Sequence, residues 1–327
     1  MISLAVELLR RGGLVAFPTE TVYGLGADAT NPTAVRRIFA AKSRPGTNPL
    51  IVHVADASIA RRYARTWPKA ADELARRFWP GPLTLVLPKA ESIVPETTAG
   101  RDSVGLRSPD HPLALQLLRE FDGPIAAPSA NRSNRVSPTT AEHVRRELGG
   151  AVDIILDGGP CRVGIESTVL DLTGKMPVIL RPGSVTRAQL EQAIGRVEVF
   201  EGNISPDKAA HSPGQQAVHY SPVAPAHRFT SSESEQLASW CGAHAEETIV
   251  VMGIAGSATS IILKDSPSPR LRLILMPNDP DEYARRLYAA LHEADGPGVG
   301  AIRIEMPDDL PSWIAIRDRI IRATRAL

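Results

Sequence analysis

The chain has 327 residues, and its 37 Lys and Arg residues nearly balance its 36 Asp and Glu residues, for a net charge of +1. A protein that coats nucleic acid would carry a clear basic excess, so this balance argues against that class while leaving room for a local cationic pocket. The two cysteines, Cys161 and Cys241, are far apart and lack CxxC spacing. They imply neither a disulfide framework nor a cysteine zinc site, and they fit a reducing compartment.

The first residues, MISLAVELLRRGG, form a short amphipathic stretch with charges inside it, which is unlike a signal peptide. No apolar run approaches the roughly 20 residues that a membrane span needs. We therefore expect a cytoplasmic protein that has no membrane partner.

In the first 200 residues, strand and helix patterns alternate. Short apolar runs bounded by Gly, Pro, Asn or Asp predict strands at 14–17, 49–54, 83–88, 103–107, 124–129, 153–158, 167–172 and 177–181. Apolar residues at steps of three and four predict helices at 34–43, 71–79, 113–121, 140–148 and 187–194. Candidate helix caps are Thr139 or Thr140, and Ser184 or Thr186. Several strands follow one another without a helix between them, so we expect a mixed sheet.

Residues 201–230 show no periodicity and are rich in proline, serine and histidine, which predicts a linker or a functional loop. Beyond it, helices are predicted at 234–244, 279–295 and 310–327, and strands at 247–253, 271–276 and 299–305. This alternation is typical of a small α/β layer with a largely parallel sheet. The predicted domains are 1–200 and 231–327, joined by the loop at 201–230.

Basic residues gather at the ends of the predicted strands, beside Gly, Pro, Ser or Asn. They are Lys42, Arg44, Arg107, Arg132, Arg135 and Arg181. Taken singly, each stretch is as well explained by a capped turn or a solvated loop. Ligands of open α/β sheets bind beside strand ends, however, so the set together predicts a site for a polyanion, most simply a nucleoside triphosphate. The usual nucleotide signatures GxxxxGK[ST] and GxGxxG are missing, and so is the GxSxG elbow of hydrolases.

Several long stretches carry a family resemblance when read in order: PTETVYGLGADA, KSRPGTNPLIVHV, WPGPLTLVLP, SVGLRSP, PIAAPSANRSNRVSPT and GIESTVLDL with VILRPG. Together they resemble the YrdC-like domain of the threonylcarbamoyl-AMP synthase family over residues 5–200. The segment SPGQQAVHYSP at 212–222 is similar to the linker of the two-domain form, which adds a C-terminal Rossmann-like α/β domain. The resemblance implies a YrdC-like twisted mixed sheet with flanking helices, followed by that smaller domain.

The resemblance also implies a reaction. L-threonine, bicarbonate and ATP with Mg²⁺ would give L-threonylcarbamoyl-adenylate, pyrophosphate and water, in a nucleotidyltransferase reaction. The adenylate would serve a downstream complex that makes the threonylcarbamoyladenosine of tRNA, with weak or absent direct binding of tRNA to this chain. The magnesium would arrive with ATP and would need no protein ligands.

The matched motif positions imply the site residues. Around L-threonine we expect Thr21, His53, Arg107, Ala127 and Ser167. Around ATP we expect Lys42, Arg44, Asn48, Ser103, Ser129, Ser137 and Arg181. Arg107 would pair with the carboxylate of threonine, preferably through two parallel hydrogen bonds. His53 is expected to line the pocket on the threonine side, and the sequence leaves its exact role open.

No activated covalent nucleophile is evident in the sequence, and Cys161 is expected to be structural because no histidine is paired with it in the pattern. The linker departs from the family pattern at Gln215–Val218, where two cations are missing. We still expect 212–222 to act as a lid over the site, using His219, Tyr220 and the backbone.

Three alternatives stay open at this point. An RNA-binding module would need aromatic stacking platforms, and aromatic residues are only 5% of the chain. A related carbamoyl-transfer or hydrogenase-maturation protein would carry zinc-finger cysteines. A regulatory protein with an inactive pocket would not need the complete set of motifs.

Overall fold

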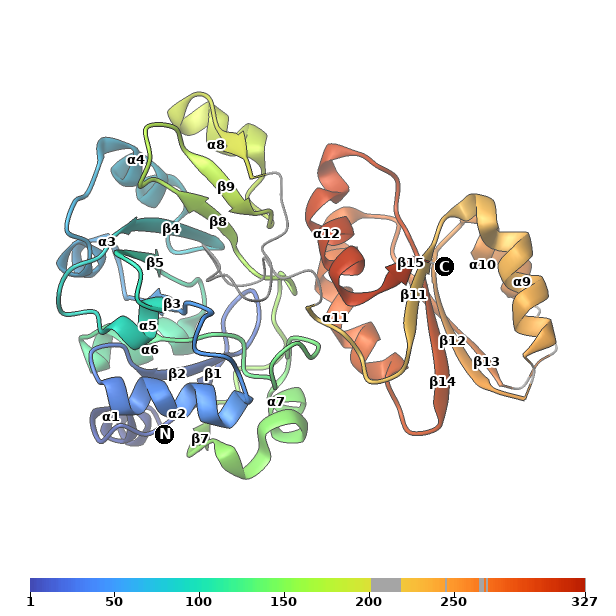
Figure 1. The fold of residues 1–327 in the computed structure, drawn as a ribbon, viewed down its shortest axis with the longest axis horizontal. Helices are drawn as coiled ribbons and strands as arrows, with labels where there is room; N and C mark the ends of the chain where they lie inside the picture. Colours follow the sequence, from blue (N-terminus) through green and yellow to red (C-terminus); the bar gives the residue numbers. More distant parts are fainter. Residues whose placement is uncertain (201–218, 245, 265–267, 269, 327) are drawn as a thin grey trace. The chain divides into compact units, whose positions relative to one another are not determined.

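The structure is a computed structural model, and it describes residues 1–200, 219–244, 246–264, 268 and 270–326. The chain forms two compact units. One comprises Met1–Ser133 and Ser137–Ala217, and the other comprises Asn134–Val136 and Val218–Leu327 (Figure 1). In the ranges that the structure describes, no helix is both long enough and apolar enough to cross a membrane.

A mixed sheet forms the centre of the first unit, with the strand order β10-β9-β8-β4-β5-β3-β6-β2-β1-β7. Its strands are β1 Val15–Phe17, β2 Gly24–Asp28, β3 Ile51–His53, β4 Leu83–Pro88, β5 Ser103–Arg107, β6 Ile125–Ala126, β7 Ile154–Ile155, β8 Thr168–Asp171, β9 Val178–Arg181 and β10 Glu198–Val199. Parallel pairs such as β3 with β5 and antiparallel pairs such as β4 with β5 both occur, which confirms the predicted mixed sheet.

Helices cover both faces of this sheet. They are α1 Ile2–Arg10, α2 Pro32–Lys42, α3 Ala57–Ala60, α4 Lys69–Phe78, α5 Pro95–Thr98, α6 Pro112–Phe121, α7 Ala141–Leu148 and α8 Arg187–Ile194, with short 3-10 turns at Arg61–Tyr63 and Gly149–Ala151. Strand β1 shows the two faces, because Ala16 packs into one hydrophobic cluster while Val15 and Phe17 pack into another. Burial on both sides explains why these strands read as continuous apolar runs.

Two of the expected caps are present. Thr140 caps α7 by accepting a hydrogen bond from the backbone N–H of His143, and Thr186 forms a capping box with Gln189 at α8. The alternatives Thr139 and Ser184 lie outside these positions. A Thr hydroxyl satisfies an N–H that the first helical turn leaves without a partner, so the sequence located both helix starts.

The second unit holds a five-stranded sheet with the order β13-β12-β14-β11-β15, and all of its strand pairs are parallel. The strands are β11 Ala226–Phe229, β12 Thr248–Ile254, β13 Leu271–Met276, β14 Val299–Glu305 and β15 Arg325–Ala326. The helices are α9 Ser234–Ala243, α10 Ala258–Leu263, α11 Pro280–Ala294 and α12 Ile314–Ala323, with 3-10 turns at Ser231–Glu233 and Pro311–Trp313. Figure 1 shows α9 and α10 on one face of this sheet and α11 and α12 on the other, as expected for a Rossmann-like layer.

Several elements differ from the sequence predictions. No helix was predicted at α1, α3, α5 or α10 and no strand at β2 or β10, and β11 lies inside the segment 201–230 that was read as a linker or loop. Helix α12 ends at Ala323, and a short strand follows it. Strand β11 reads AHRF and buries only Phe229, so it shows no apolar alternation, and its pairing with β14 and β15 gives it its strand conformation.

Candidate functional site

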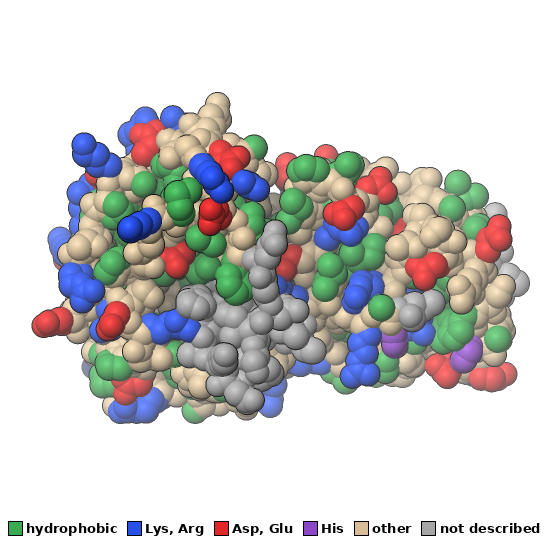
Figure 2. Space-filling view, turned by 45° about the horizontal axis from the view of Figure 1, so that its top comes forward, with side chains coloured by type: hydrophobic (Ala, Val, Ile, Leu, Met, Phe, Trp, Pro, Cys, Tyr) green, Lys and Arg blue, Asp and Glu red, His purple; other side chains and the backbone are tan. Residues whose placement is uncertain are grey.

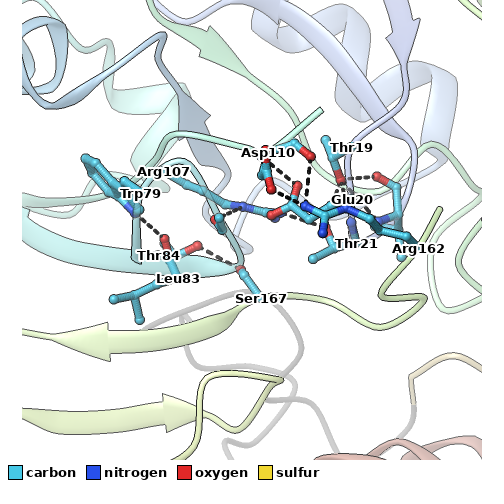
Figure 3. Close-up of polar contacts among 12 residues, drawn as sticks. Thr19, Glu20, Thr21, Trp79, Leu83, Thr84, Arg107, Asp110, Arg162 and Ser167 are labelled. Carbon is cyan, nitrogen blue, oxygen red and sulfur yellow. Dashed lines mark hydrogen bonds and ion pairs between the residues drawn. The ribbon is translucent and has the colours of Figure 1, made fainter. Parts of the chain in front are cut away.

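The centre of the candidate site is Arg107, the last residue of β5, which is almost fully buried. Its Nη2 donates to Glu20 Oε1 at 2.7 Å and to Thr21 Oγ1 at 2.9 Å, and its Nε donates to the carbonyl of Gly81 at 3.2 Å (Figure 3). Glu20 and Thr21 belong to the turn between β1 and β2. The structure therefore brings the predicted residues Thr21 and Arg107 into direct contact.

The Thr21 hydroxyl also contacts Thr19, whose Oγ1 lies 2.8 Å away. Thr19 Oγ1 donates to the carbonyl of Val22 at 2.7 Å and accepts from the backbone N–H groups of Thr21 and Val22 at 3.1 and 3.2 Å. Thr21 Oγ1 also accepts from Arg107. Thr21 Oγ1 thus lies between the guanidinium of Arg107 and the hydroxyl of Thr19.

His53 ends β3 directly beside Arg107, since the two residues are register partners in the parallel β3–β5 pair. Its ring packs edge-on against Phe17, with centroids 5.9 Å apart. Burial, followed by the charge of Arg107, lowers the pKa of His53 from 6.5 to about 3. Among the described residues, its buried Nδ1 makes no hydrogen bond. A neutral imidazole of this kind can line a pocket but is a poor proton acceptor.

The lowered pKa of His53 predicts a pH-dependent stability. Its folded-state pKa of about 3 lies below the ordinary 6.5, so as the pH falls the unfolded chain binds the proton first. We expect the free energy of unfolding to fall between pH 6.5 and 3, with a loss of ~2 kcal/mol from His53 at pH 5. Urea unfolding of the parent protein and His53→Gln at pH 7 and pH 5 measures this difference. If both proteins lost the same free energy of unfolding, the prediction would be wrong. The loss would then come from groups that both proteins contain, such as His143, whose pKa is also lowered.

A second group joins Ser167 to Arg181. Arg181 Nε and Nη2 donate to the carbonyl of Ser167 at 3.1 and 3.0 Å, and Nη2 also donates to Ser167 Oγ at 3.2 Å. Ser167 Oγ lies 2.8 Å from Thr84 Oγ1, on β4 (Figure 3). All three side chains are buried. A residue predicted for threonine therefore holds a residue predicted for ATP.

A third group surrounds Lys42, a residue that is 1% exposed. Lys42 Nζ donates to the carbonyl of Ser129 at 2.6 Å, to the carbonyl of Asn131, and to Asn131 Oδ1 at 3.3 Å. Burial, followed by the charge of Arg44, lowers the pKa of Lys42 well below its ordinary value. The ammonium thus braces the loop that carries Ser129, and contact with phosphate stays a prediction.

The other predicted ATP residues lie at several points of the same unit. Ser137 Oγ donates to buried Glu166 Oε1 at 2.6 Å, and Arg44 Nη2 donates to the carbonyl of Pro49 at 3.4 Å. Asn48 is buried. Ser103 begins the strand that Arg107 ends, so the two lie about 13 Å apart along β5.

A shallow hollow lies over one face of the sheet, and its lining includes Ile51, Thr84, Ser103, Gly105 and Val169. Ala127, the remaining residue predicted for threonine, donates its backbone N–H to the carbonyl of Ile51 at 2.9 Å. A side chain at Gly105 would begin 3.1 Å from Thr84 Cγ2, so glycine keeps this face open. The lining of this hollow is partly apolar and partly polar.

Cys161 is buried beside this network and is not a nucleophile. Burial, followed by the charge of Glu20, raises the pKa of its thiol to about 12. Because the thiolate is the reactive form, the thiol is inert near neutral pH. We expect Cys161→Ala to keep its activity within about threefold, and native protein at pH 8 to resist thiol-alkylating reagents at this position. Loss of activity in Cys161→Ala without loss of folding would contradict this assignment.

The sequence prediction missed Glu20, Thr19, Thr84 and Glu166. Their common feature is a side chain that contacts a predicted residue from a neighbouring segment. Glu20 had one signal, because a carboxylate lies between two threonines directly after a buried strand. The contacts of Thr84 and Glu166 depend on pairing between distant segments.

The residues predicted for the lid belong to the second unit where they are described. His219 and Tyr220 are buried, with ring centroids 4.0 Å apart, and Tyr220 lies under the guanidinium of Arg319 and beside Tyr288. The rest of the predicted lid, 212–218, lies outside the described residues. The lid stays a prediction.

Two family models match the chain. The model described as "Telomere recombination", which groups Sua5, YciO and YrdC proteins, matches residues 7–183. The model described as "Threonylcarbamoyl-AMP synthase, C-terminal domain" matches residues 185–324. The first match alone covers more than half of the chain.

Proteins named threonylcarbamoyl-AMP synthase are similar along the chain. The protein of Pyrococcus abyssi is 39% identical over 99% of this chain and 94% of its own length, and that of Schizosaccharomyces pombe is 37% identical over 94% and 84%. The Bacillus subtilis protein is 52% identical over 68% of this chain, and this match spans 65% of that relative.

Solved structures agree over the same length. P. abyssi Sua5 complexed with L-threonine matches 100% of this chain and 96% of that chain, with a TM-score of 0.89 and 37% identity. A doubly substituted variant of the same protein matches 99% of this chain and 94% of that chain, with a TM-score of 0.88 and 38% identity. The chain therefore belongs to the threonylcarbamoyl-AMP synthase family, in the two-domain form with a YrdC-like domain and a C-terminal α/β domain.

Proposed function

We propose that this chain makes L-threonylcarbamoyl-adenylate and pyrophosphate from L-threonine, bicarbonate and ATP, as a nucleotidyltransferase. The observation that carries the proposal is the contact between Arg107 and Thr21. It places a buried guanidinium beside a hydroxyl, which suits the carboxylate and the amine of an amino acid. The likeness to a structure in complex with L-threonine supports the same substrate.

The proposed chemistry needs positioning and charge neutralisation. The amine of threonine would react with bicarbonate and release water, and the resulting carbamate oxygen would attack the α-phosphorus of ATP and release pyrophosphate. Neither step requires a covalent enzyme intermediate, and the inert thiol of Cys161 fits this scheme. Preorganised cations would neutralise the developing charge on the phosphates.

We place ATP over the hollow that contains Ser103 and Gly105, with Arg181 and Arg44 on the phosphate side. Arg181 is held in place by the carbonyl of Ser167, which supports a fixed orientation for its guanidinium. Mg²⁺ would arrive on the triphosphate. In the part of the chain that the structure describes, no group of three His, Cys, Asp or Glu side chains could hold a metal ion.

The product would pass to a threonylcarbamoyl-transferase complex that modifies tRNA, in the cytoplasm, where a reducing environment suits the two free cysteines. An RNA-binding role is less well supported. On the face drawn in Figure 2, Lys and Arg side chains alternate with Asp and Glu side chains and form no continuous basic stripe.

The direct test is a pyrophosphate assay with ATP, Mg²⁺, bicarbonate and L-threonine. We expect pyrophosphate release that requires both threonine and bicarbonate, together with a product of the mass of threonylcarbamoyl-adenylate. Equal release without threonine, or no release at all, would refute the proposed function.

A further inference from the structure

We propose that Glu20 is a positioning residue for the amino-acid substrate, which acts by fixing the guanidinium of Arg107. This inference rests on the proposed function, because it takes Arg107 as the partner of the threonine carboxylate. Glu20 was not among the residues predicted from the sequence.

The Glu20–Arg107 pair is almost completely buried. The Glu20 side chain is 0% exposed and that of Arg107 is 4% exposed, and their N–O distance is 2.7 Å. A buried ion pair of this kind seldom adds net stability, because desolvation offsets the attraction. We therefore consider how Glu20 orients the guanidinium of Arg107, rather than how much the pair stabilises the fold.

Three of the five N–H groups of Arg107 are engaged by fixed acceptors: the Gly81 carbonyl, Glu20 and Thr21. Among the described residues, Nη1 has no partner, and its two N–H groups remain for a ligand. A guanidinium can form a bidentate pair with a carboxylate through Nη1 and Nη2 or through Nε and Nη2. Both arrangements need Nη2, whose N–H groups already donate to Glu20 and Thr21. We therefore infer that the substrate carboxylate binds at Nη1, in contrast to the bidentate pair expected from the sequence.

The second oxygen of Glu20 fixes the carboxylate itself. Glu20 Oε2 accepts from the backbone N–H of Asp110 at 3.0 Å, and the carbonyl of Glu20 accepts from Val163 at 2.7 Å (Figure 3). Each carboxylate oxygen thus receives its own donor. Glutamine has a single acceptor oxygen, so Glu20→Gln must place an NH₂ group against either Arg107 or the N–H of Asp110.

The same pair orients Thr21. Arg107 Nη2 donates to both Glu20 Oε1 and Thr21 Oγ1, so a guanidinium that leaves Glu20 also leaves Thr21. Both proposed contacts of the substrate, the carboxylate at Nη1 and the amine at Thr21, then depend on one carboxylate. The contacts of Arg181 with Ser167 do not include Glu20.

The test compares Glu20→Gln with Glu96→Gln, which removes the partner of Arg36 at an exposed ion pair of the same unit. For Glu20→Gln we expect the KM for L-threonine to rise ~10-fold and the KM for ATP to change less than ~2-fold. Glu96→Gln should leave both values unchanged. In parallel, the increase in melting temperature caused by saturating L-threonine should shrink in Glu20→Gln, while the increase caused by ATP persists.

A merely structural role would raise both KM values together, and that result would overturn the inference, as would unchanged values. Glu20→Asp keeps both acceptor oxygens and serves as the second variant. If it folds, its KM for threonine should lie between those of the parent protein and Glu20→Gln. If neither variant folds, Glu20 is structural and the inference is wrong. If the parent protein releases no threonine-dependent pyrophosphate, the proposed function fails instead, and the melting measurement still tests Glu20.

Discussion

Replacing Arg107 by lysine should remove the use of L-threonine while the protein stays folded and still binds ATP. Lysine keeps the positive charge opposite Glu20 but has no second nitrogen in the place of Nη1. Losing one partner of a buried charged pair costs ~3 kcal/mol, so kcat/KM for threonine should fall about 100-fold or more. Alanine is the less informative change, because it leaves the carboxylate of Glu20 buried without a partner.

The measurement is steady-state pyrophosphate release with threonine varied at saturating ATP, and then with ATP varied. Arg36→Lys is the matched control, since it makes the same exchange at an exposed pair with Glu96. Surface pairs contribute little, and this control should keep full activity. If Arg107→Lys affected threonine and ATP equally, the assignment of Arg107 to the amino-acid side would be wrong.

Replacing Arg181 by methionine should mainly weaken the use of ATP. Methionine retains an unbranched chain of similar length but leaves the carbonyl of Ser167 without the guanidinium that now donates to it. A guanidinium that neutralises phosphate in a buried site is worth ~2–4 kcal/mol, so kcat/KM for ATP should fall about 30-fold to 1000-fold.

Titration calorimetry with a non-hydrolysable ATP analogue separates binding from turnover in Arg181→Met. Arg187→Met is a suitable control, because Arg187 forms an exposed pair with Glu191 in helix α8. We expect the control to bind the analogue normally. If kcat/KM fell more for threonine than for ATP, the assignment of Arg181 to the ATP side would be wrong. The test can give that result because Arg181 also contacts Ser167, a residue predicted for the threonine side.

The strand pattern was predictable because burial on both faces leaves a local signal. The runs at 49–54 and 83–88 contain β3 and β4, and 271–276 matches the bounds of β13. Strand β2 was missed because its glycines, Gly24 and Gly26, resemble a turn. Gly26 is required by packing, since a side chain there would begin 2.8 Å from both Ile125 and Phe17.

The sequence also singled out Thr21 and Arg107, through motifs that are continuous in the chain, and the structure brings the two into contact. It could not show that Lys42 donates to the carbonyls of Ser129 and Asn131, 87 and 89 residues away. Charge at a strand end is visible in a sequence, whereas the partner of that charge is set by which loops the sheet brings together.

The sequence by itself determined the two α/β domains and the family, because these depend on local periodicity and on continuous motifs. Only the tertiary structure decided how the charges are paired. Glu20 and Arg107 lie 87 residues apart and meet because β5 ends beside the turn that follows β1. That pairing leaves Nη1 as the part of Arg107 without a partner among the described residues, since a guanidinium has a fixed number of N–H groups and the fold engages the others.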